Sequence, residues 1–390
     1  MEGDFIKTNN WLLPFSWLYG LAVKFRNTLF EMGVLKTRAF DIPVISVGNI
    51  TVGGTGKTPH VEYLVQLLKN SFNVAVLSRG YKRKSKGFVK ADQDTPMLEI
   101  GDEPYQMKQK FPDITVAVDK KRCHGIDILT EQDQSLDVIL LDDAFQHRYV
   151  KPGINILLVD YHRLIIYDKL LPAGRLREPL EGKNRADVVI VTKCPKDLKP
   201  MEYRVVTKAM QLYPYQNLFF TTLDYGELEP LFKETLPIAP QLDDLKDHHT
   251  LLLTGIASPE QMVHDLSPLT DHLQSLSFAD HHMFTAKDVQ LINDTFAAMQ
   301  GPKLIITTEK DATRLKGLEG LSDEVRKHMY LLPVHISFLQ NQEDMFNQQI
   351  ISYVRKNSRN SILAKRKDDN KSDNSNYSGD RPRTISFRNN

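Results

Sequence analysis

The sequence predicts an α/β protein with a P-loop NTPase-like parallel sheet flanked by helices, a second smaller α/β domain and an N-terminal amphipathic helix. Two observations predict the main domain. From residue 42 onward, short apolar runs rich in Val and Ile alternate with segments of helical length and period. One of these runs leads directly into a glycine-rich loop that ends in Gly56-Lys57-Thr58. Repeated strand–helix–strand units of this kind fold into a parallel sheet covered by helices.

The first predicted element is an amphipathic helix within residues 11–33. Its apolar residues recur at helical spacing, with Lys24 and Arg26 outside the apolar stripe. Both tryptophans, Trp11 and Trp17, lie here, and Trp beside cations is typical of a lipid headgroup boundary. The longest uncharged apolar stretch has only thirteen residues, too few to cross a bilayer. The helix therefore either packs on the domain or lies on a membrane surface.

The main sheet is expected to contain six buried strands, which the chain places at 42–47, 74–77, 115–118, 138–141, 156–159 and 188–191. Further strand candidates follow at 218–222, 251–255, 304–308 and 329–334, interleaved with helices. From about residue 356 the chain has too few apolar residues to fold, so we expect a disordered basic tail. The predicted parts are a membrane-associating helix at 1–38, a P-loop kinase domain at 39–195, a second α/β domain at 196–355 and the tail at 356–390.

Composition is that of a globular chain, with 390 residues, 41% hydrophobic and 25% charged. The net charge of +1 combines +8 in residues 1–90, −12 in residues 91–355 and +5 in residues 356–390. Basic ends suggest an anionic partner, either nucleic acid or an anionic lipid surface. Cys123 and Cys194 lie far apart in sequence, so neither a disulfide framework nor a cysteine zinc site is expected. No secretory signal is evident.

The strongest motif is VISVGNITVGGTGKTPH at residues 44–60, where a strand, a glycine-rich turn and a helix follow one another. This is the context of a P-loop, whose backbone amides hold phosphate oxygens while Lys57 reaches the β- and γ-oxygens and Thr58 binds Mg²⁺. The GxxxxGK[ST] pattern has glycine at the position of residue 51, where this chain has threonine. A chance glycine-rich hairpin is the alternative. The residues predicted to bind the nucleotide are Thr51, Gly53, Gly54, Thr55, Gly56, Lys57 and Thr58.

A P-loop enzyme also needs a carboxylate at the end of a neighbouring strand. The segment DVILLDDAFQH at 137–147 supplies Asp142 and Asp143 directly after an apolar run. Both are predicted to help hold Mg²⁺, although adjacent acids at a strand end could instead cap the next helix. A P-loop alone leaves the acceptor open among GTPases, kinases, ligases and metallochaperones.

Eight motifs together resemble the tetraacyldisaccharide 4'-kinase family, and they occur in the family's order over about residues 11–340. They are VGNITVGGTGKTP, LSRGYKRKSKG, GDEPYQM, LLDDAFQHR, LLPAGRLREPL, VTKCP, FADHHMF and IITTEKDATRL. The resemblance implies an enzyme of the lipid A pathway that uses ATP and Mg²⁺. Its implied substrate is an acylated glucosamine disaccharide 1-phosphate, phosphorylated at the 4'-hydroxyl. It also implies a monotopic protein at the cytoplasmic face of the bacterial inner membrane, with no nucleic acid and no obligate protein partner.

The resemblance also assigns catalytic residues. Asp102 of GDEP is implied to be the general base, assisted by a histidine of the DHH motif. We take His281 as that histidine, with His282 as the alternative. An imidazole beside the carboxylate would orient it and tune its basicity. From the residues alone, Asp102 could equally be a helix cap.

Further contacts are implied around the phosphates. Glu103 is implied to join Asp142 and Asp143 near Mg²⁺, and Arg122 and Arg177 to contact phosphate or substrate, where guanidinium geometry is suitable. Two features fit less well or stay open. Ala144 stands where the family usually has glycine, and the basic run Lys82-Arg83-Lys84 with Lys86 is either a solvated loop or a contact for anionic lipid or the 1-phosphate. Arg175 is a less certain contact.

Two other function classes are weighed against the kinase. A P-loop GTPase or metallochaperone predicts an Asn-Lys-x-Asp element, whereas residues 192–195 read Thr-Lys-Cys-Pro, and the sequence has no His/Cys cluster for a metal. A nucleic-acid binder would account for the basic ends, but the chain contains no familiar reading module.

Overall fold

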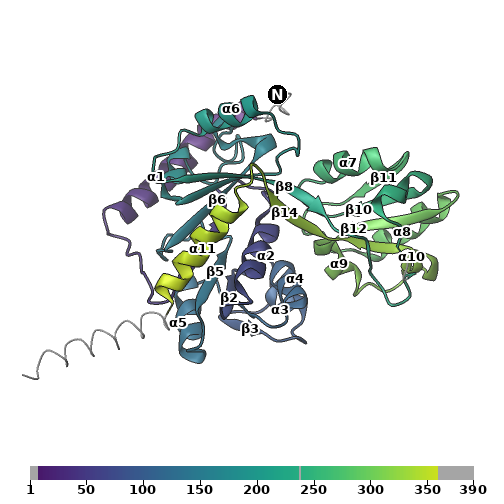
Figure 1. Cartoon of the computed structure of the whole chain (residues 1–390), viewed down its shortest axis with the longest axis horizontal. Helices are drawn as coiled ribbons and strands as arrows, with labels where there is room; N and C mark the ends of the chain where they lie inside the picture. Colours follow the sequence, from purple (N-terminus) through teal and green to yellow (C-terminus); the bar gives the residue numbers. More distant parts are fainter. Residues whose placement is uncertain (1–7, 237–238, 359–390) are drawn as a thin grey trace, which may run out of the picture.

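A computed structural model of the chain describes residues 8–236 and 239–358 and arranges them around two sheets (Figure 1). The expectation of a disordered tail therefore falls almost entirely outside the described residues. The larger, nine-stranded sheet carries the P-loop, and the smaller, five-stranded sheet lies beside it on the right of Figure 1. The predicted α/β class, with a parallel main sheet and a second smaller sheet, is confirmed.

The main sheet has the strand order β14-β8-β7-β6-β1-β5-β2-β4-β3. All neighbours pair in parallel except the two edge strands, β3 and β14, which pair antiparallel. The central strands are buried along their whole length, which explains their unbroken Val and Ile runs. The strands are β1 (Val44–Gly48), β2 (Val74–Ser78), β3 (Val89–Ala91), β4 (Thr115–Val118), β5 (Val138–Asp142), β6 (Ile154–Asp160), β7 (Val188–Thr192), β8 (Asn217–Tyr225) and β14 (Val334–Phe338).

Helices cover both faces of this sheet. One face packs against α2 (Lys57–Leu68), α4 (Asp102–Lys110) and α11 (Glu343–Asn357) in a single apolar cluster. The opposite face packs against α5 (Arg122–Gln132) and α6 (Pro200–Met210). The short α3 (Met97–Ile100) precedes α4. The segments of helical length that alternate with the apolar runs thus include α2, α4 and α5.

The smaller sheet has the order β11-β10-β12-β13-β9. Its strands and the helices between them are, in chain order, β9 (Glu229–Pro230), β10 (His249–Thr254), α7 (Glu260–Leu266), β11 (His272–Ser277), α8 (Ala286–Ala298), β12 (Lys303–Thr308), α9 (Glu309–Leu315), α10 (Asp323–Lys327) and β13 (Met329–Leu332).

The two sheets divide the chain differently from the predicted boundary at residue 195. The main sheet also recruits β8 and β14, which lie beyond that boundary, so the chain leaves the main sheet after β8 and returns through β14. The strand expected at 329–334 is correspondingly wrong. It ends at Leu332, and β14 begins at Val334 in the other sheet. Pro333 separates them because proline lacks the N–H that would continue the ladder.

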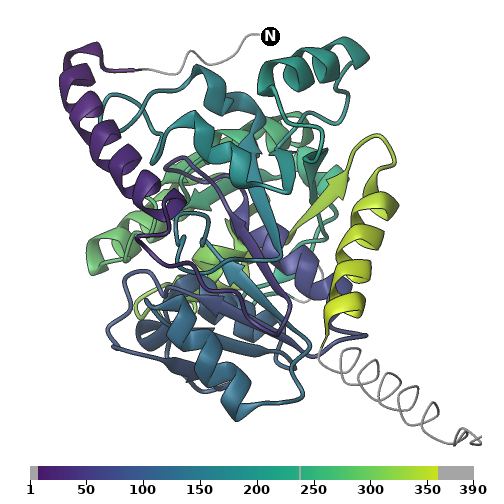
Figure 2. The same cartoon turned by 90° about the vertical axis from the view of Figure 1, so that its left-hand side faces the viewer.

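The N-terminal helix α1 (Leu13–Glu31) runs along the outside of the main domain (Figure 2). It docks through small and polar side chains. Ser16 Oγ donates to the Leu170 carbonyl at 2.9 Å, and a Cβ on Gly20 would lie 2.6 Å from the Leu170 Cδ1 methyl, so a larger residue at position 20 would require the Leu170 side chain to move. Five large apolar side chains of α1, and that of Trp11 in the turn before it, point outward, each at least 61% exposed: Trp11, Phe15, Trp17, Leu18, Leu21 and Phe25. We call these six residues the α1 ridge.

Within the described residues, no helix combines the length and apolar character needed to span a membrane. Of the two interpretations open from sequence, packing of α1 on the domain is observed, and the exposed α1 ridge leaves binding to a membrane surface as a prediction.

Candidate active site

The P-loop connects β1 to α2, as the motif predicts. Gly56 precedes the helix with a φ of +78°, a left-handed conformation that favours glycine. The loop residues from Val52 to Thr58 line a cavity of about 490 Å³, together with Arg177, Asp143 and Glu103. Asp280, His281 and Lys310 of the smaller domain line the same cavity, so both domains contribute to one site.

The P-loop is held in place by three side chains below it. Asn49 Nδ2 donates to Thr55 Oγ1 at 2.8 Å, and Thr192 Oγ1 donates to the Thr55 carbonyl at 3.1 Å. His60 Nδ1 lies 2.7 Å from the Gly56 carbonyl and His60 Nε2 lies 3.1 Å from Thr221 Oγ1. Because a carbonyl only accepts, Nδ1 carries the proton and Nε2 accepts from the threonine. A neutral His60 therefore ties the loop to β8.

The protonation state of His60 leads to a pH prediction. Burial lowers the pKa of His60 to about 4, whereas a histidine in an unfolded chain titrates near pH ~6.5. As pH falls below the unfolded value, the unfolded chain takes up a proton that the folded protein does not. The free energy of unfolding therefore decreases as the pH is lowered, by at most about 3 kcal/mol between the two pKa values. Replacing His60→Asn should make the fall in Tm between pH ~7 and pH ~5 smaller than in the wild type, measured by circular dichroism. Equal falls in both proteins would contradict this role.

The carboxylates predicted for Mg²⁺ lie at the end of β5 and on the neighbouring α4. Asp143 contacts Lys57 Nζ at 3.7 Å and Arg177 at 3.3 Å. Burial works to raise the pKa of Asp143, but Lys57 and Arg177 outweigh it and hold that pKa below its usual range. Asp142 is in the opposite situation, because burial, Glu103 and Asp143 together raise its pKa to about 7.

The environment of Asp142 suits a cation. Its Oδ1 atom is buried and has no hydrogen-bond partner. Among residues 8–236 and 239–358, no group of three or more His, Cys, Asp or Glu side chains is arranged to hold a metal ion by itself. Mg²⁺ in phosphoryl-transfer sites takes one or two carboxylates and completes its shell with water and substrate phosphates. Asp142 and the Thr58 hydroxyl fit that smaller requirement.

The structure brings Asp102 and His281 together from opposite domains. Asp102 begins α4, where the helix dipole favours a negative charge. His281 Nδ1 lies 2.8 Å from Asp102 Oδ2, and Arg314 of α9 forms a short ion pair with the same oxygen. Burial alone would raise the pKa of Asp102, but His281, Lys310 and Arg314 outweigh it and place that pKa well below its usual range. The ion pair with Arg314 stabilises the carboxylate of Asp102.

The alternative partner, His282, lies elsewhere. Its Nε2 atom is 2.9 Å from Asp288, and its ring stacks on Phe278. These contacts hold it against the start of α8. Of the two histidines in the motif, only His281 reaches Asp102 in this structure.

Arg177 and Arg122 occupy different positions. Arg177 lines the cavity and contacts Asp143, as expected for a phosphate or substrate contact. Arg122 is buried and donates to the carbonyls of Asp119 and Asp142 at 2.6 and 3.1 Å. It lies behind Asp142 rather than along the cavity wall, so its observed contacts are with the backbone that positions Asp142.

The basic run and Arg175 are partly accounted for. Lys82 donates to the His281 carbonyl at 3.3 Å and thereby links the two domains, while Arg83 folds back onto the Val118 carbonyl. Arg175 lies beside the start of the P-loop, where its backbone carbonyl accepts from Val52 N at 2.8 Å.

Sequence reasoning missed Lys310 and Arg314, although both fall in the quoted motif IITTEKDATRL. Lys310 Nζ lies 3.1 Å from Asp280 and 3.7 Å from Glu103, and Arg314 also pairs with Asp311 at 3.0 Å. The available signal was their spacing. Two cations four residues apart at the start of a helix that follows a buried strand lie on one helix face.

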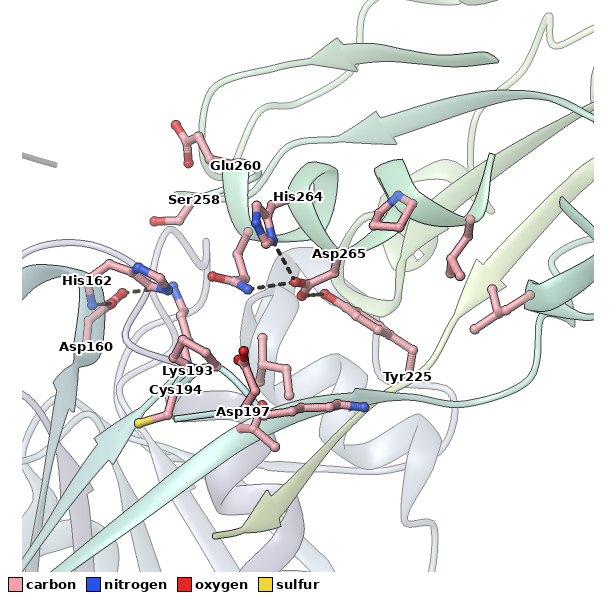
Figure 3. Close-up of a pocket in the computed structure, with 18 of the residues that line it drawn as sticks. Asp160, His162, Lys193, Cys194, Asp197, Tyr225, Ser258, Glu260, His264 and Asp265 are labelled. Carbon is pink, nitrogen blue, oxygen red and sulfur yellow. Dashed lines mark hydrogen bonds and ion pairs between the residues drawn. The ribbon is translucent and has the colours of Figure 1, made fainter. Parts of the chain in front are cut away.

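A second cavity, of about 810 Å³, lies between the domains next to the first (Figure 3). Lys193, Tyr225 and Ser258 line both cavities, so the two are contiguous. Lys193 forms a buried ion pair with Asp160 at 3.0 Å, and Tyr225 donates to Asp265 at 2.8 Å. Thr192 of the TKCP segment is the last residue of β7, and the three residues that follow it line this cavity.

Comparisons with known proteins agree with one another. A family model described as Tetraacyldisaccharide-1-P 4'-kinase matches residues 8–355. The tetraacyldisaccharide 4'-kinase of Phocaeicola vulgatus is 61% identical over 365 residues, 93% of this chain and 99% of that protein. The tetraacyldisaccharide 4'-kinase of Bacteroides thetaiotaomicron is 54% identical over 375 residues, 94% of this chain and 98% of that protein.

A solved structure is also similar. The apo form of LpxK from Aquifex aeolicus in complex with ATP shares 32% identity and a TM-score of 0.66 with this chain. The match covers 88% of this chain and 98% of that one, so it includes both domains.

Proposed function

The chain belongs to the tetraacyldisaccharide-1-P 4'-kinase family and is an ATP-dependent kinase, and on that premise we propose which residues carry out its reaction. The kinase transfers the γ-phosphoryl group of ATP to the 4'-hydroxyl of the tetraacyldisaccharide 1-phosphate in lipid A biosynthesis. The comparisons support this activity and not the GTPase or metallochaperone alternative. One observation carries the residue assignment: a single cavity is lined by the P-loop of one domain and by His281 of the other, and His281 is hydrogen-bonded to Asp102.

ATP is proposed to bind with its phosphates on the P-loop and its nucleoside in the adjoining cavity beside Lys193 and Tyr225. The P-loop amides and Lys57 face the smaller cavity, and the larger one continues from it along the end of β7. In parallel α/β sheets, ligands bind outside the carboxyl ends of the strands. The contiguous cavities therefore provide room for both halves of the nucleotide.

Mg²⁺ is proposed to be held by Thr58 and Asp142, with Glu103 and Asp143 close by. When bound, it would neutralise charge on the β- and γ-phosphate oxygens. The buried Oδ1 of Asp142, which has no hydrogen-bond partner, and the raised pKa of this carboxyl group support this placement, because a bound cation would contact that oxygen and favour the charged form.

The Asp102–His281 pair is proposed to take the proton of the 4'-hydroxyl. As the hydroxyl oxygen bonds to the γ-phosphorus, the bond from that phosphorus to the β,γ-bridging oxygen breaks and ADP leaves. Lys57 and Arg177 lie where they can balance charge on the transferred group, since both flank Asp143 on the cavity wall. Because Asp102 and His281 come from different domains, the pair is complete only when the domains are together.

The α1 ridge is proposed to bind the cytoplasmic face of the inner membrane, where the acyl chains of the substrate reside. Six large apolar side chains face outward from α1 and the turn before it, with Lys24 and Arg26 nearby. Tyr19 Oη donates to the Arg177 carbonyl at 2.7 Å, so the helix is fixed directly to a cavity residue. A lipid held at the ridge would therefore lie close to the cavity.

Purified protein should transfer radiolabelled phosphate from ATP to tetraacyldisaccharide 1-phosphate in mixed micelles. A bisphosphorylated lipid that depends on Mg²⁺ is the expected product, separated by thin-layer chromatography. No labelled lipid under these conditions would refute the activity, whereas label without any effect of the Asp102 or His281 variants would refute only the residue assignment.

Arg314 is proposed to be a positioning residue that holds Asp102 in place. In Arg314→Gln the ion pair with Asp102 is lost, and we expect kcat to fall about 100-fold, the scale expected of a misplaced reacting group. Losing the cation should also raise the pKa of Asp102, so the acidic limb of the pH–rate profile should move to higher pH. Arg326→Gln is the control, since it also removes an arginine of the smaller domain: Arg326 pairs with Glu234, donates to the Leu318 carbonyl and lies over the ring of Phe232, and it lines neither cavity. An unshifted profile in Arg314→Gln would contradict the proposed role.

A further inference from the structure

A second apolar surface lies on α6 and the loop that follows it. Met201 and Val205 lie one turn apart on the outer side of the helix, and Tyr213 and Tyr215 extend the surface beyond its end. These four side chains are 66%, 36%, 50% and 59% exposed. We call them the α6 ridge. The inner side of the same helix packs on the main domain through the buried Val206 and Met210, so the ridge lies on the side of the helix that faces away from that domain.

The loop of the α6 ridge is rigidly built. The rings of Tyr213 and Tyr215 stack with centroids 5.6 Å apart and planes 7° from parallel. Tyr215 Oη donates to the Asn184 carbonyl at 2.7 Å. The buried Gln216 side chain accepts from Tyr213 N and donates to the carbonyls of Lys183 and Ala186. The exposed rings are therefore held in position by fixed hydrogen bonds.

The charge around the α6 ridge is mostly positive. Lys199, Arg204 and Lys208 are all exposed, and none of them forms an ion pair within the part of the chain that the structure describes. The carboxylate of Glu202 is already hydrogen-bonded, because it accepts from the backbone N–H of Lys199 in the capping box of the helix. Exposed apolar and aromatic residues among unpaired cations are typical of a helix that lies on anionic lipid.

The position of the α6 ridge connects it to α1. Both helices lie at the upper end of the molecule in two views at right angles to each other (Figures 1 and 2). In addition, α1 hydrogen-bonds to Leu170, and Leu170 packs on the cluster that contains Val206 and Met210. The two helices therefore pack on the same layer of the main domain.

We propose that the α6 ridge is a second membrane contact, which binds anionic phospholipid headgroups and the adjoining acyl region together with the α1 ridge. This inference rests on the proposed membrane binding of α1. A single helix leaves the protein free to rotate about the helix axis. Two separated ridges fix the orientation, so that the cavity keeps a constant height and direction relative to the lipid surface.

The test compares the full chain with four double variants on sonicated vesicles of phosphatidylcholine, with and without about 30% phosphatidylglycerol. Met201→Ser with Tyr213→Ser removes apolar contacts of the α6 ridge, and Trp17→Ser with Phe25→Ser does the same for the α1 ridge. Leu291→Ser with Met345→Ser is the matched control, since those side chains are also exposed but lie on α8 and α11. Equal Tm values and equal ATP binding verify that each variant is folded.

We expect the α6 variant to bind anionic vesicles roughly tenfold more weakly, with the control unchanged. Arg204→Gln with Lys208→Gln should also lose roughly tenfold, but only on vesicles that contain phosphatidylglycerol. Wild-type binding by the α6 variant alongside loss by the α1 variant would overturn the inference and leave the membrane proposal for α1 intact. No wild-type binding to either vesicle would overturn both. If the α6 variant instead changes only the oligomeric state in size-exclusion chromatography, the ridge binds a second copy of the chain and the inference is wrong.

Discussion

Replacing Asp102→Asn is expected to lower kcat by about 10²–10⁴, the range attributed to a lost general base. The amide keeps the shape of the carboxylate but does not take up a proton near neutral pH. KM for ATP should change little, because Asp102 does not line the P-loop. Single-turnover transfer from radiolabelled ATP measures the effect.

The variant also leaves Arg314 buried beside a neutral group, so its stability must be measured separately. Removing one partner of a buried ion pair costs about 3–5 kcal/mol in other proteins, and a lower Tm is therefore expected. Asp280→Asn compares the loss of a different carboxylate of the same site, since Asp280 pairs with Lys310 and lies 3.7 Å from His281 Nε2 but does not contact Asp102 in the described residues. A full-rate Asp102→Asn enzyme with the expected loss of Tm would reduce Asp102 to a structural residue.

The local motifs of the first domain were predictable because each is continuous in sequence. A run such as residues 138–142 carries both its strand, through its apolar residues, and its function, through the acid at its end. The P-loop is similar, since the strand, the glycines and Lys57 follow one another. Thr51 stands where the P-loop pattern has glycine, and the loop residues that follow it still line the cavity.

The arrangement of the domains was much less predictable. The residues at 217–225 do not indicate by themselves that this strand pairs in the first sheet. The apolar run at 329–334 is continuous in sequence, although its last residue belongs to a strand of the other sheet, after Pro333. The edge strand β11 was missed because little of it is buried, so it lacks an apolar run. These features depend on pairing between distant segments, which a single sequence does not display.

The same limit applies to the pair proposed to be catalytic. Asp102 and His281 are 179 positions apart, and only the family resemblance joined them in the sequence analysis. Arg314 was not assigned at all, because its partner lies 212 positions away. Arg122 shows the opposite failure, in which a motif position was identified but its burial behind Asp142 was not.

Replacing Lys57→Met is expected to lower kcat/KM for ATP by about 10³ or more, because the variant loses the cation that stabilises the transferred charge. Methionine keeps the length of the side chain and fills its space. Lys57 is mostly buried, with 13% of its side chain exposed, and it shares Asp143 with Arg177. Without it, Asp142 and Asp143 both lose a positive charge that favours their ionised forms.

This second loss makes the variant informative about Mg²⁺. If Asp142 and Thr58 hold the metal, Mg²⁺ should still bind, and extra Mg²⁺ should restore part of the ATP affinity but not the rate. Lys69→Met, at the far end of the same helix, is the control for loss of a lysine from this region. Near-normal kcat/KM in Lys57→Met would mean that the phosphates lie elsewhere, and the assignment of the glycine-rich loop as the phosphate site would then be wrong.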